Sequence, residues 1–95
     1  MSKHAVHKYP VEAEREFVVT MPVGAQILSV HAAGDDASMW ALVDPRATVA
    51  KVERTFRVLS TGETVRDAHE LTFIGTFFVK RGLVFHLFEK LPRPE

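Results

Sequence analysis

The chain contains no cysteine. Disulfide bonds, thiolate nucleophiles and zinc sites built on sulfur are therefore excluded. Glycine-rich phosphate-binding loops are absent as well, because neither G-x-G-x-x-G nor G-x-x-x-x-G-K-[ST] occurs in the sequence. These absences leave no motif from which a cofactor or an enzymatic activity can be predicted, and we expect neither.

No apolar run is long enough to cross a membrane. The longest nearly apolar stretch, LTFIGTFFV at residues 71–79, falls far short of the roughly 20 residues that a membrane helix requires. The initial sequence MSKHAVHKYP lacks the apolar core of a secretory signal. We therefore expect a cytoplasmic protein without a membrane partner.

The charges of the chain balance, with 12 lysine and arginine residues against 12 aspartate and glutamate residues. No overall field attracts a phosphate backbone and no basic patch is evident, so the sequence does not favour nucleic acid as a partner. Hydrophobic residues make up 46% of the chain and charged residues 25%, as in soluble globular domains. A chain of 95 residues supports one hydrophobic core, which predicts a single domain over residues 1–95.

Glycine and proline divide the chain into segments of about ten residues, the spacing of successive strands joined by tight turns. These segments predict an all-β fold of about six strands, either a small antiparallel sandwich or a partly open barrel. An extended piece around Tyr9 precedes them, and residues 1–7 and 91–95 are expected to be flexible tails. The predicted strands comprise residues 17–21, 26–32, 39–43, 51–60, 71–80 and 83–90.

Two segments between the predicted strands leave helical structure open. Asp44 before Pro45 is typical of a helix start, and residues 45–52 are compatible with a helical turn or with the beginning of the next strand. The polar sequence VRDAHE at residues 65–70 is also compatible with one helical turn. Periodicity alone does not decide between helix and strand at 45–52.

The last predicted hairpin, which turns at Arg81–Gly82, is apolar on both of its faces. Alternation along its second strand separates an odd-numbered apolar set from an even-numbered set that includes His86. One face packs on the core, whereas the other requires another sheet, a helix or a second subunit, since burial contributes roughly 1.5–3 kcal/mol for each large apolar side chain. The pattern predicts a homo-oligomer with an apolar interface containing Phe78, Val84 and Phe88.

The first strand of this hairpin shows the same two-sided character. Strict alternation places Phe73 and Phe77 on one face and Ile74 and Phe78 on the other. The Gly75–Thr76 pair between them indicates a bulge or a close approach of two backbones. Phenylalanine is thus expected on both faces of the hairpin.

Four polar or aromatic residues are candidates for ligand or interface contacts: Trp40, Arg54, His69 and His86. Trp40 is interpreted as a core residue, an interface anchor or a stacking surface for a base. Arg54 shares the apolar parity of its strand, so it either extends from the strand end into solvent or binds an anion or a partner. His86 is expected to bond through its ring nitrogens to a backbone carbonyl or a neighbouring side chain, with a ligand contact as the alternative.

Five histidines raise the question of metal binding or acid–base chemistry. His4 and His7 have the i, i+3 spacing with which one helix face could present two ligands to a metal. Short helices at chain termini are marginally stable, so no metal site is predicted. A small hydrolase would use His69 or His86 with Glu70 or Glu89. No nucleophile pattern accompanies these residues, so we predict no catalytic residue.

Several short motifs follow one another along the chain: MPVGAQILSV at 21–30, WALVDP at 40–45, FIGTF at 73–77 and LVFHLFE at 83–89. In this order they resemble a family of small uncharacterised proteins encoded by tailed bacteriophages and prophages, and the resemblance covers nearly the whole chain. It implies phage origin, expression inside a bacterial cell and a dispensable accessory role rather than a part of the virion. It implies no catalytic activity.

The leading hypothesis is a non-enzymatic, homo-oligomeric phage accessory protein that binds a host protein, in counter-defence or host modulation. It follows from the two-sided apolar hairpin and from the absence of catalytic motifs. The alternative is an oligomer that sequesters a small nucleotide-like ligand. Such a ligand would be held by Arg54, His69 or His86 as donors and stacked on Trp40 or a phenylalanine.

Overall fold

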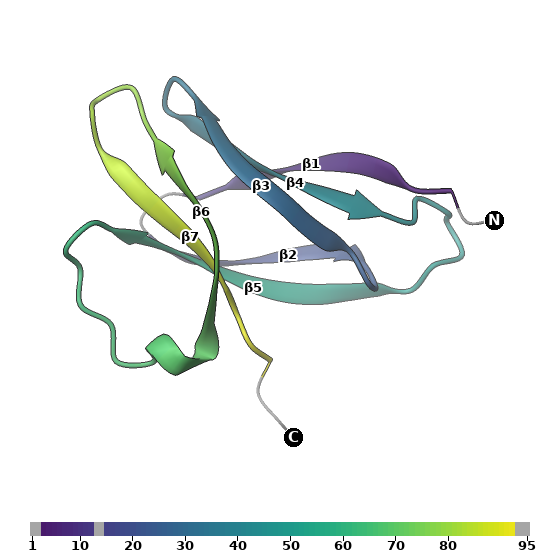
Figure 1. Cartoon of the computed structure of the whole chain (residues 1–95). Helices are drawn as coiled ribbons and strands as arrows, with labels where there is room; N and C mark the ends of the chain where they lie inside the picture. Colours follow the sequence, from purple (N-terminus) through teal and green to yellow (C-terminus); the bar gives the residue numbers. More distant parts are fainter. Residues whose placement is uncertain (1–2, 13–14, 93–95) are drawn as a thin grey trace.

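The computed structural model describes residues 3–12 and 15–92 and consists almost entirely of antiparallel strands (Figure 1). The prediction of an all-β sandwich is confirmed, with seven strands in the described part of the chain rather than about six. The strands are β1 (Ala5–Val11), β2 (Glu16–Pro22), β3 (Gln26–Ala33), β4 (Asp36–Val43), β5 (Lys51–Ser60), β6 (Leu71–Phe78) and β7 (Val84–Lys90).

The additional strand is β1, which the sequence indicates only as an extended piece around Tyr9. Residues 5–7, assigned to a flexible tail from the sequence, belong to β1 and pair with residues 41–43 of β4. The rest of the two predicted tails is described only at residues 3–4 and 91–92. Residues 1–2 and 93–95 lie outside the described residues.

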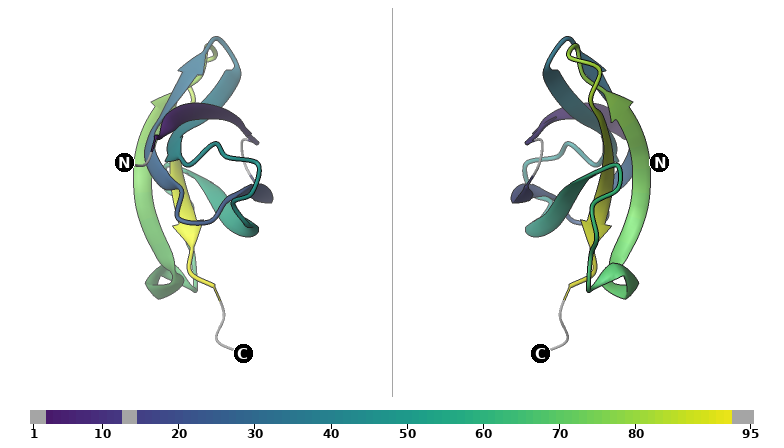
Figure 2. Two further views of the ribbon diagram at one scale, coloured as in Figure 1. Left: turned by 90° about the vertical axis from the view of Figure 1, so that its right-hand side faces the viewer. Right: turned by 90° about the vertical axis from the view of Figure 1, so that its left-hand side faces the viewer.

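The strands form two sheets, a three-stranded sheet in the order β1-β4-β3 and a four-stranded sheet in the order β2-β5-β7-β6. The molecule measures 43 × 35 × 17 Å, and its short dimension accommodates two packed layers. β6 forms a long curved strand at one side, and a 3-10 turn, η1 (Ala68–Glu70), leads into it (Figure 2). η1 is the helical turn predicted within VRDAHE.

The turns occur at glycine and proline as predicted, but one of them connects strands of different sheets. The β3–β4 and β6–β7 hairpins pair as expected. The turn after Pro22, with Gly24 at φ 79°, carries the chain from the four-stranded sheet to the three-stranded sheet instead of closing a hairpin. The sequence leaves helix or strand open at residues 45–52. The structure has a turn over residues 47–49 and a strand that begins at Lys51.

The core lies between the sheets and is built from alternate residues of each strand. β4 contributes its odd-numbered residues, and β5 contributes Phe56 and Val58. Trp40 has the opposite parity in β4 and is therefore not a core residue, so the core interpretation of Trp40 is wrong. The largest fully buried side chains are Phe56, Phe77, Met21, Met39, Leu87, Val43 and Val58.

A bulge in β6 overturns the predicted alternation of its aromatic residues. The register with β7 shifts between Phe73 and Gly75, which inserts one extra residue into β6. Phe73 and Phe78 consequently point away from the core together, whereas Phe77 is buried. Gly75 also permits the close approach of β3, because a Cβ atom at this position would lie 2.9 Å from Val30 Cγ1.

None of the described residues forms a helix that is long and apolar enough to cross a membrane.

Candidate binding surface

The outer face of the four-stranded sheet carries apolar side chains on both sides of a Thr76–His86 pair. In β7 the odd-numbered residues Phe85 and Leu87 are buried in the core, so the even-numbered residues point outward. Cross-strand pairing joins these outward residues to their neighbours on β5 and β6. We call this surface the phenylalanine face, which comprises Leu59, Phe73, Thr76, Phe78, Val84, His86 and Phe88.

Two phenylalanines of this face are unusually exposed. Phe78 retains 67% of its accessible surface and Phe73 retains 57%. The Phe73 ring packs edge-on against Phe88 with a centroid separation of 5.5 Å, and the Thr76–His86 pair lies between these two rings and Phe78. In the described part of the chain no third layer lies over this sheet. Exposed contiguous apolar patches on soluble proteins commonly mark interaction surfaces.

His86 lies within the apolar patch, and both of its ring nitrogens are bonded to side chains. Nδ1 lies 2.9 Å from Thr76 Oγ1, and Nε2 lies 2.8 Å from Thr61 Oγ1. A neutral imidazole donates to one hydroxyl and accepts from the other. The expected bonding of His86 to neighbouring side chains is thus confirmed. Covering this face would leave no ring nitrogen of His86 without a partner.

A neutral charge cluster borders the apolar patch. The Arg57 guanidinium donates to Asp67 at 2.6 and 2.8 Å and to Glu16 at 3.0 and 2.7 Å. Lys90 Nζ approaches the same two carboxylates at 3.8 and 3.9 Å. The hydrogen bond from Arg57 lowers the pKa of Asp67 to about 2. Two acids and two bases therefore balance on this part of the face.

Asp67→Asn is expected to reduce the loss of unfolding free energy that the wild-type protein shows as the pH falls below about 4. The pKa of Asp67 is depressed by folding, so its contribution is complete above the unfolded value of about 3.9 and is lost as the pH falls toward 2. Urea unfolding at pH 6, 4, 3 and 2 measures this limb. Asp35→Asn, in the β3–β4 turn, is the control. Parallel acid limbs for wild type and Asp67→Asn would contradict the assignment.

Arg54 is occupied by an internal ion pair. Its Nε and Nη2 donate to the Glu89 carboxylate at 2.6 Å each, and Nη1 donates to the backbone carbonyl of Ala25. The hydrogen bond to Glu89 raises the pKa of Arg54. The pair joins β5 and β7 to the start of β3, between two hollows of about 330 and 310 Å³ that share its two residues. Arg54 therefore neither extends freely into solvent nor offers an uncompensated charge to an anion.

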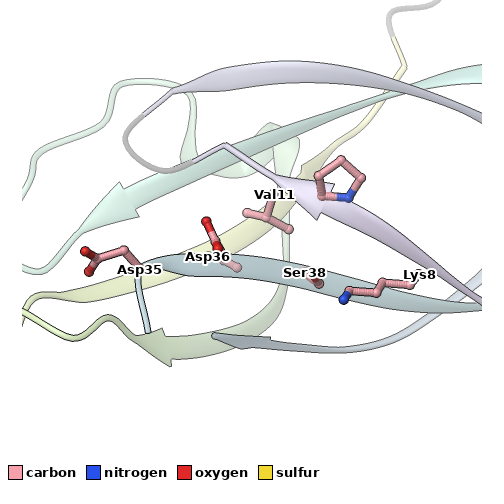
Figure 3. Close-up of a pocket in the computed structure, with 7 residues that line it drawn as sticks. Lys8, Val11, Asp35, Asp36 and Ser38 are labelled. Carbon is pink, nitrogen blue, oxygen red and sulfur yellow. The ribbon is translucent and has the colours of Figure 1, made fainter. Parts of the chain in front are cut away.

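Trp40 lies on the outer face of the three-stranded sheet, half-buried, with Lys8 Nζ 5.6 Å from its ring centroid. Lys8 also borders the hollow of about 400 Å³ drawn in Figure 3. The two carboxylates at one end of that hollow do not favour an anionic ligand. The hollow is lined by Lys8, Pro10, Val11, Asp35, Asp36, Ala37 and Ser38.

Residues 2–95 match a family described as a domain of unknown function, DUF7352. The chain belongs to this family. No curated protein and no solved structure matches the chain.

In this DUF7352 member the four ligand or interface candidates lie on separate surfaces. His86 joins Phe78, Val84 and Phe88 on the phenylalanine face, whereas Trp40 is on the opposite sheet and Arg54 is bonded to Glu89. His69 lies exposed in η1, with its Nε2 4.0 Å from Glu70 Oε2. Among the described residues no three potential metal ligands cluster. The separation of these candidates places the phenylalanine face first as a binding surface.

Sequence reasoning does not find the residues that complete this face. The hydroxyls of Thr61 and Thr76 that hold His86 come from positions 25 and 10 residues away in the chain. Alternation identifies Arg57 only as part of the polar side of its strand. A signal for Phe73 exists in Gly75, because a bulge at that glycine turns Phe73 to the side of Phe78.

Proposed function

We propose that the protein acts by binding rather than by catalysis, and that it works as a homo-oligomer assembled on the phenylalanine face. The exposure of Phe73 and Phe78 on the same outer face of one sheet is the observation that supports this proposal most strongly. Burying both rings removes apolar surface from water at roughly 25 cal/mol per Å². A second copy supplies the same patch on the opposing side of a two-fold interface.

The composition of the face favours a second copy as its occupant. The charges in the bordering cluster balance, and the chain has a formal net charge of +0, so two copies meet without net repulsion. Strands about 4.8 Å apart with a rise of about 3.3 Å per residue give the outer face of the four-stranded sheet a footprint of roughly 400 Å². Two copies that meet over this whole face bury on the order of 800 Å², which is below the standard size of specific interfaces and fits a weak, reversible dimer.

Sedimentation equilibrium tests the assembly directly. Between about 1 μM and about 1 mM the weight-average mass is expected to rise from the 10.7 kDa of one chain toward twice that value, as a dissociation constant in the micromolar range requires. A mass that stays at 10.7 kDa across this range would remove the homo-oligomer from the proposal.

The biological role that we propose is accessory: the protein, made in the cytoplasm of a phage-infected bacterium, binds a host protein in counter-defence or host modulation. The support is the resemblance of its motifs to phage-encoded proteins. The test is co-purification from the host under native conditions, followed by titration of the purified partner. A partner that binds the isolated protein in a defined ratio supports this role, whereas recovery of the protein alone contradicts it.

The alternative of a nucleotide-like ligand receives less support. A nucleotide site needs a stacking surface and charged donors in one place. Here Trp40 and Lys8 lie on one sheet, His86 lies on the other, and Glu89 already neutralises Arg54. These separations favour protein binding over sequestration of a nucleotide signal.

A further inference from the structure

The register of β2 determines which of its backbone groups remain available. Val58 N–H donates to the carbonyl of Arg15 at 3.1 Å, and Val23 N–H donates to the carbonyl of Ala50 at 2.8 Å. In an antiparallel ladder the residues bonded to the partner strand alternate, so the odd-numbered residues of β2 bond to β5. The backbone N–H and C=O groups of Glu16, Val18 and Thr20 therefore point to the free edge of the sheet.

The other edges of the two sheets are less accessible to an added strand. β1 contains Pro10, which has no N–H to donate and so removes one hydrogen-bond donor from this strand. β3 and β6 lie beside one another: Gly75 packs on Val30, and Lys80 N–H donates to the carbonyl of Gly34 at 2.9 Å. Between Glu16 and Thr20 the described residues of β2 contain no proline and have no second strand beside them.

A hollow of about 290 Å³ runs along this edge. Its lining includes four consecutive β2 residues, 16 to 19. Because successive side chains of a strand point to opposite faces, a hollow that touches all four lies along the backbone edge rather than on one face. Pro10, Glu12 and Arg15 form the remainder of its wall. The hollow is thus a short groove beside unpaired backbone groups.

We propose that the β2 edge is a strand-addition site for an extended segment of a partner protein. This inference rests on the proposed host-protein binding and specifies its mode, in which backbone hydrogen bonds supply affinity. A strand added to this edge would lie about 4.8 Å from β2, on the side of the hollow. β2 contributes no residue to the phenylalanine face, so a second copy bound to that face leaves the β2 edge open to the partner segment. The segment carries an apolar side chain opposite Val18 and polar side chains opposite Glu16 and Thr20.

Val18→Pro tests this site because it removes an outward N–H and leaves the ladder to β5 intact. The probe is a yeast-displayed library of random decapeptides, selected against the wild-type protein. Selected peptides are expected to bind Val18→Pro at least tenfold more weakly than wild type. Val18→Thr keeps the donor and the β-branched side chain, and it is expected to bind within about threefold of wild type, since surface changes of this kind cost little.

Amide hydrogen exchange of the wild-type complex gives a second readout that does not depend on how Val18→Pro folds. A selected peptide is expected to slow exchange at Glu16, Val18 and Thr20. No selected peptide, equal binding to Val18→Pro, or protection confined to other strands would each overturn the proposal.

The experiments distinguish failure of the strand-addition proposal from failure of the homo-oligomer proposal. Disruption of the phenylalanine face by Phe78→Glu is expected to leave peptide affinity unchanged. If Val18→Pro abolishes self-association, the edge holds a second copy rather than a partner segment, and the inference is wrong. If no peptide binds while the wild-type protein still dimerises, only the strand-addition site falls.

Discussion

Phe78→Glu is expected to raise the dissociation constant of the homodimer at least about 100-fold, because the interface would then bury an unpaired carboxylate. In the monomer Phe78 is 67% exposed, so the substitution costs little folding stability. The substitution therefore weakens the association of two copies and not the folding of each copy. Sedimentation equilibrium at matched concentrations measures it, and circular dichroism confirms that the strands are retained.

Val6→Glu is the matched control for this change. Val6 is 54% exposed and lies on β1, in the sheet that does not carry the phenylalanine face. The same new charge at comparable exposure is expected to leave the dimer intact. Equal losses for Phe78→Glu and Val6→Glu would mean that added negative charge, and not the aromatic patch, controls association. No loss in either variant would remove Phe78 from the interface.

Arg54→Leu is expected to destabilise the fold by about 2–3 kcal/mol, because it leaves the carboxylate of Glu89 and the carbonyl of Ala25 without their donors. Both side chains of the ion pair are more than three-quarters shielded, at 21% and 23% exposure. The double variant Arg54→Leu/Glu89→Leu removes both charges and is expected to recover most of this loss. Denaturant unfolding with linear extrapolation provides the comparison.

Arg46→Leu provides the control for a surface pair of similar geometry. Arg46 donates to Asp44 at 2.6 Å, but its side chain is 68% exposed. Its removal is expected to lower the free energy of unfolding much less than Arg54→Leu does, as for most exposed ion pairs. If Arg54→Leu costs no more than Arg46→Leu, Arg54 does not hold β5, β7 and the start of β3 together as its hydrogen bonds indicate.

Much of the fold follows from local signals in the sequence. The β3–β4 and β6–β7 hairpins follow from turn residues such as Gly34 and Gly82, both of which adopt positive φ. Strand β5 follows from its period of two, which places Phe56 and Val58 in the core. Periodicity does not reveal β1 as a strand, because exposed His7 and Lys8 interrupt any apolar alternation.

The candidate surface could be anticipated only in part. The outward residues of β7 follow from alternation, but Phe73 reaches the same face through a bulge whose exact position depends on how β3 packs on Gly75. The partner of Arg54 lies 35 residues away in the chain, and no spacing rule connects the two. Contacts between strands that are distant in sequence depend on the strand order of the sheet, which periodicity does not determine.

Isotope-filtered nuclear Overhauser spectroscopy on a mixture of labelled and unlabelled protein tests the central claim most directly. At about 1 mM, where a micromolar dimer is almost fully formed, intermolecular contacts are expected from the rings of Phe73, Phe78 and Phe88. Intermolecular contacts confined to other surfaces, or none at this concentration, would contradict the account.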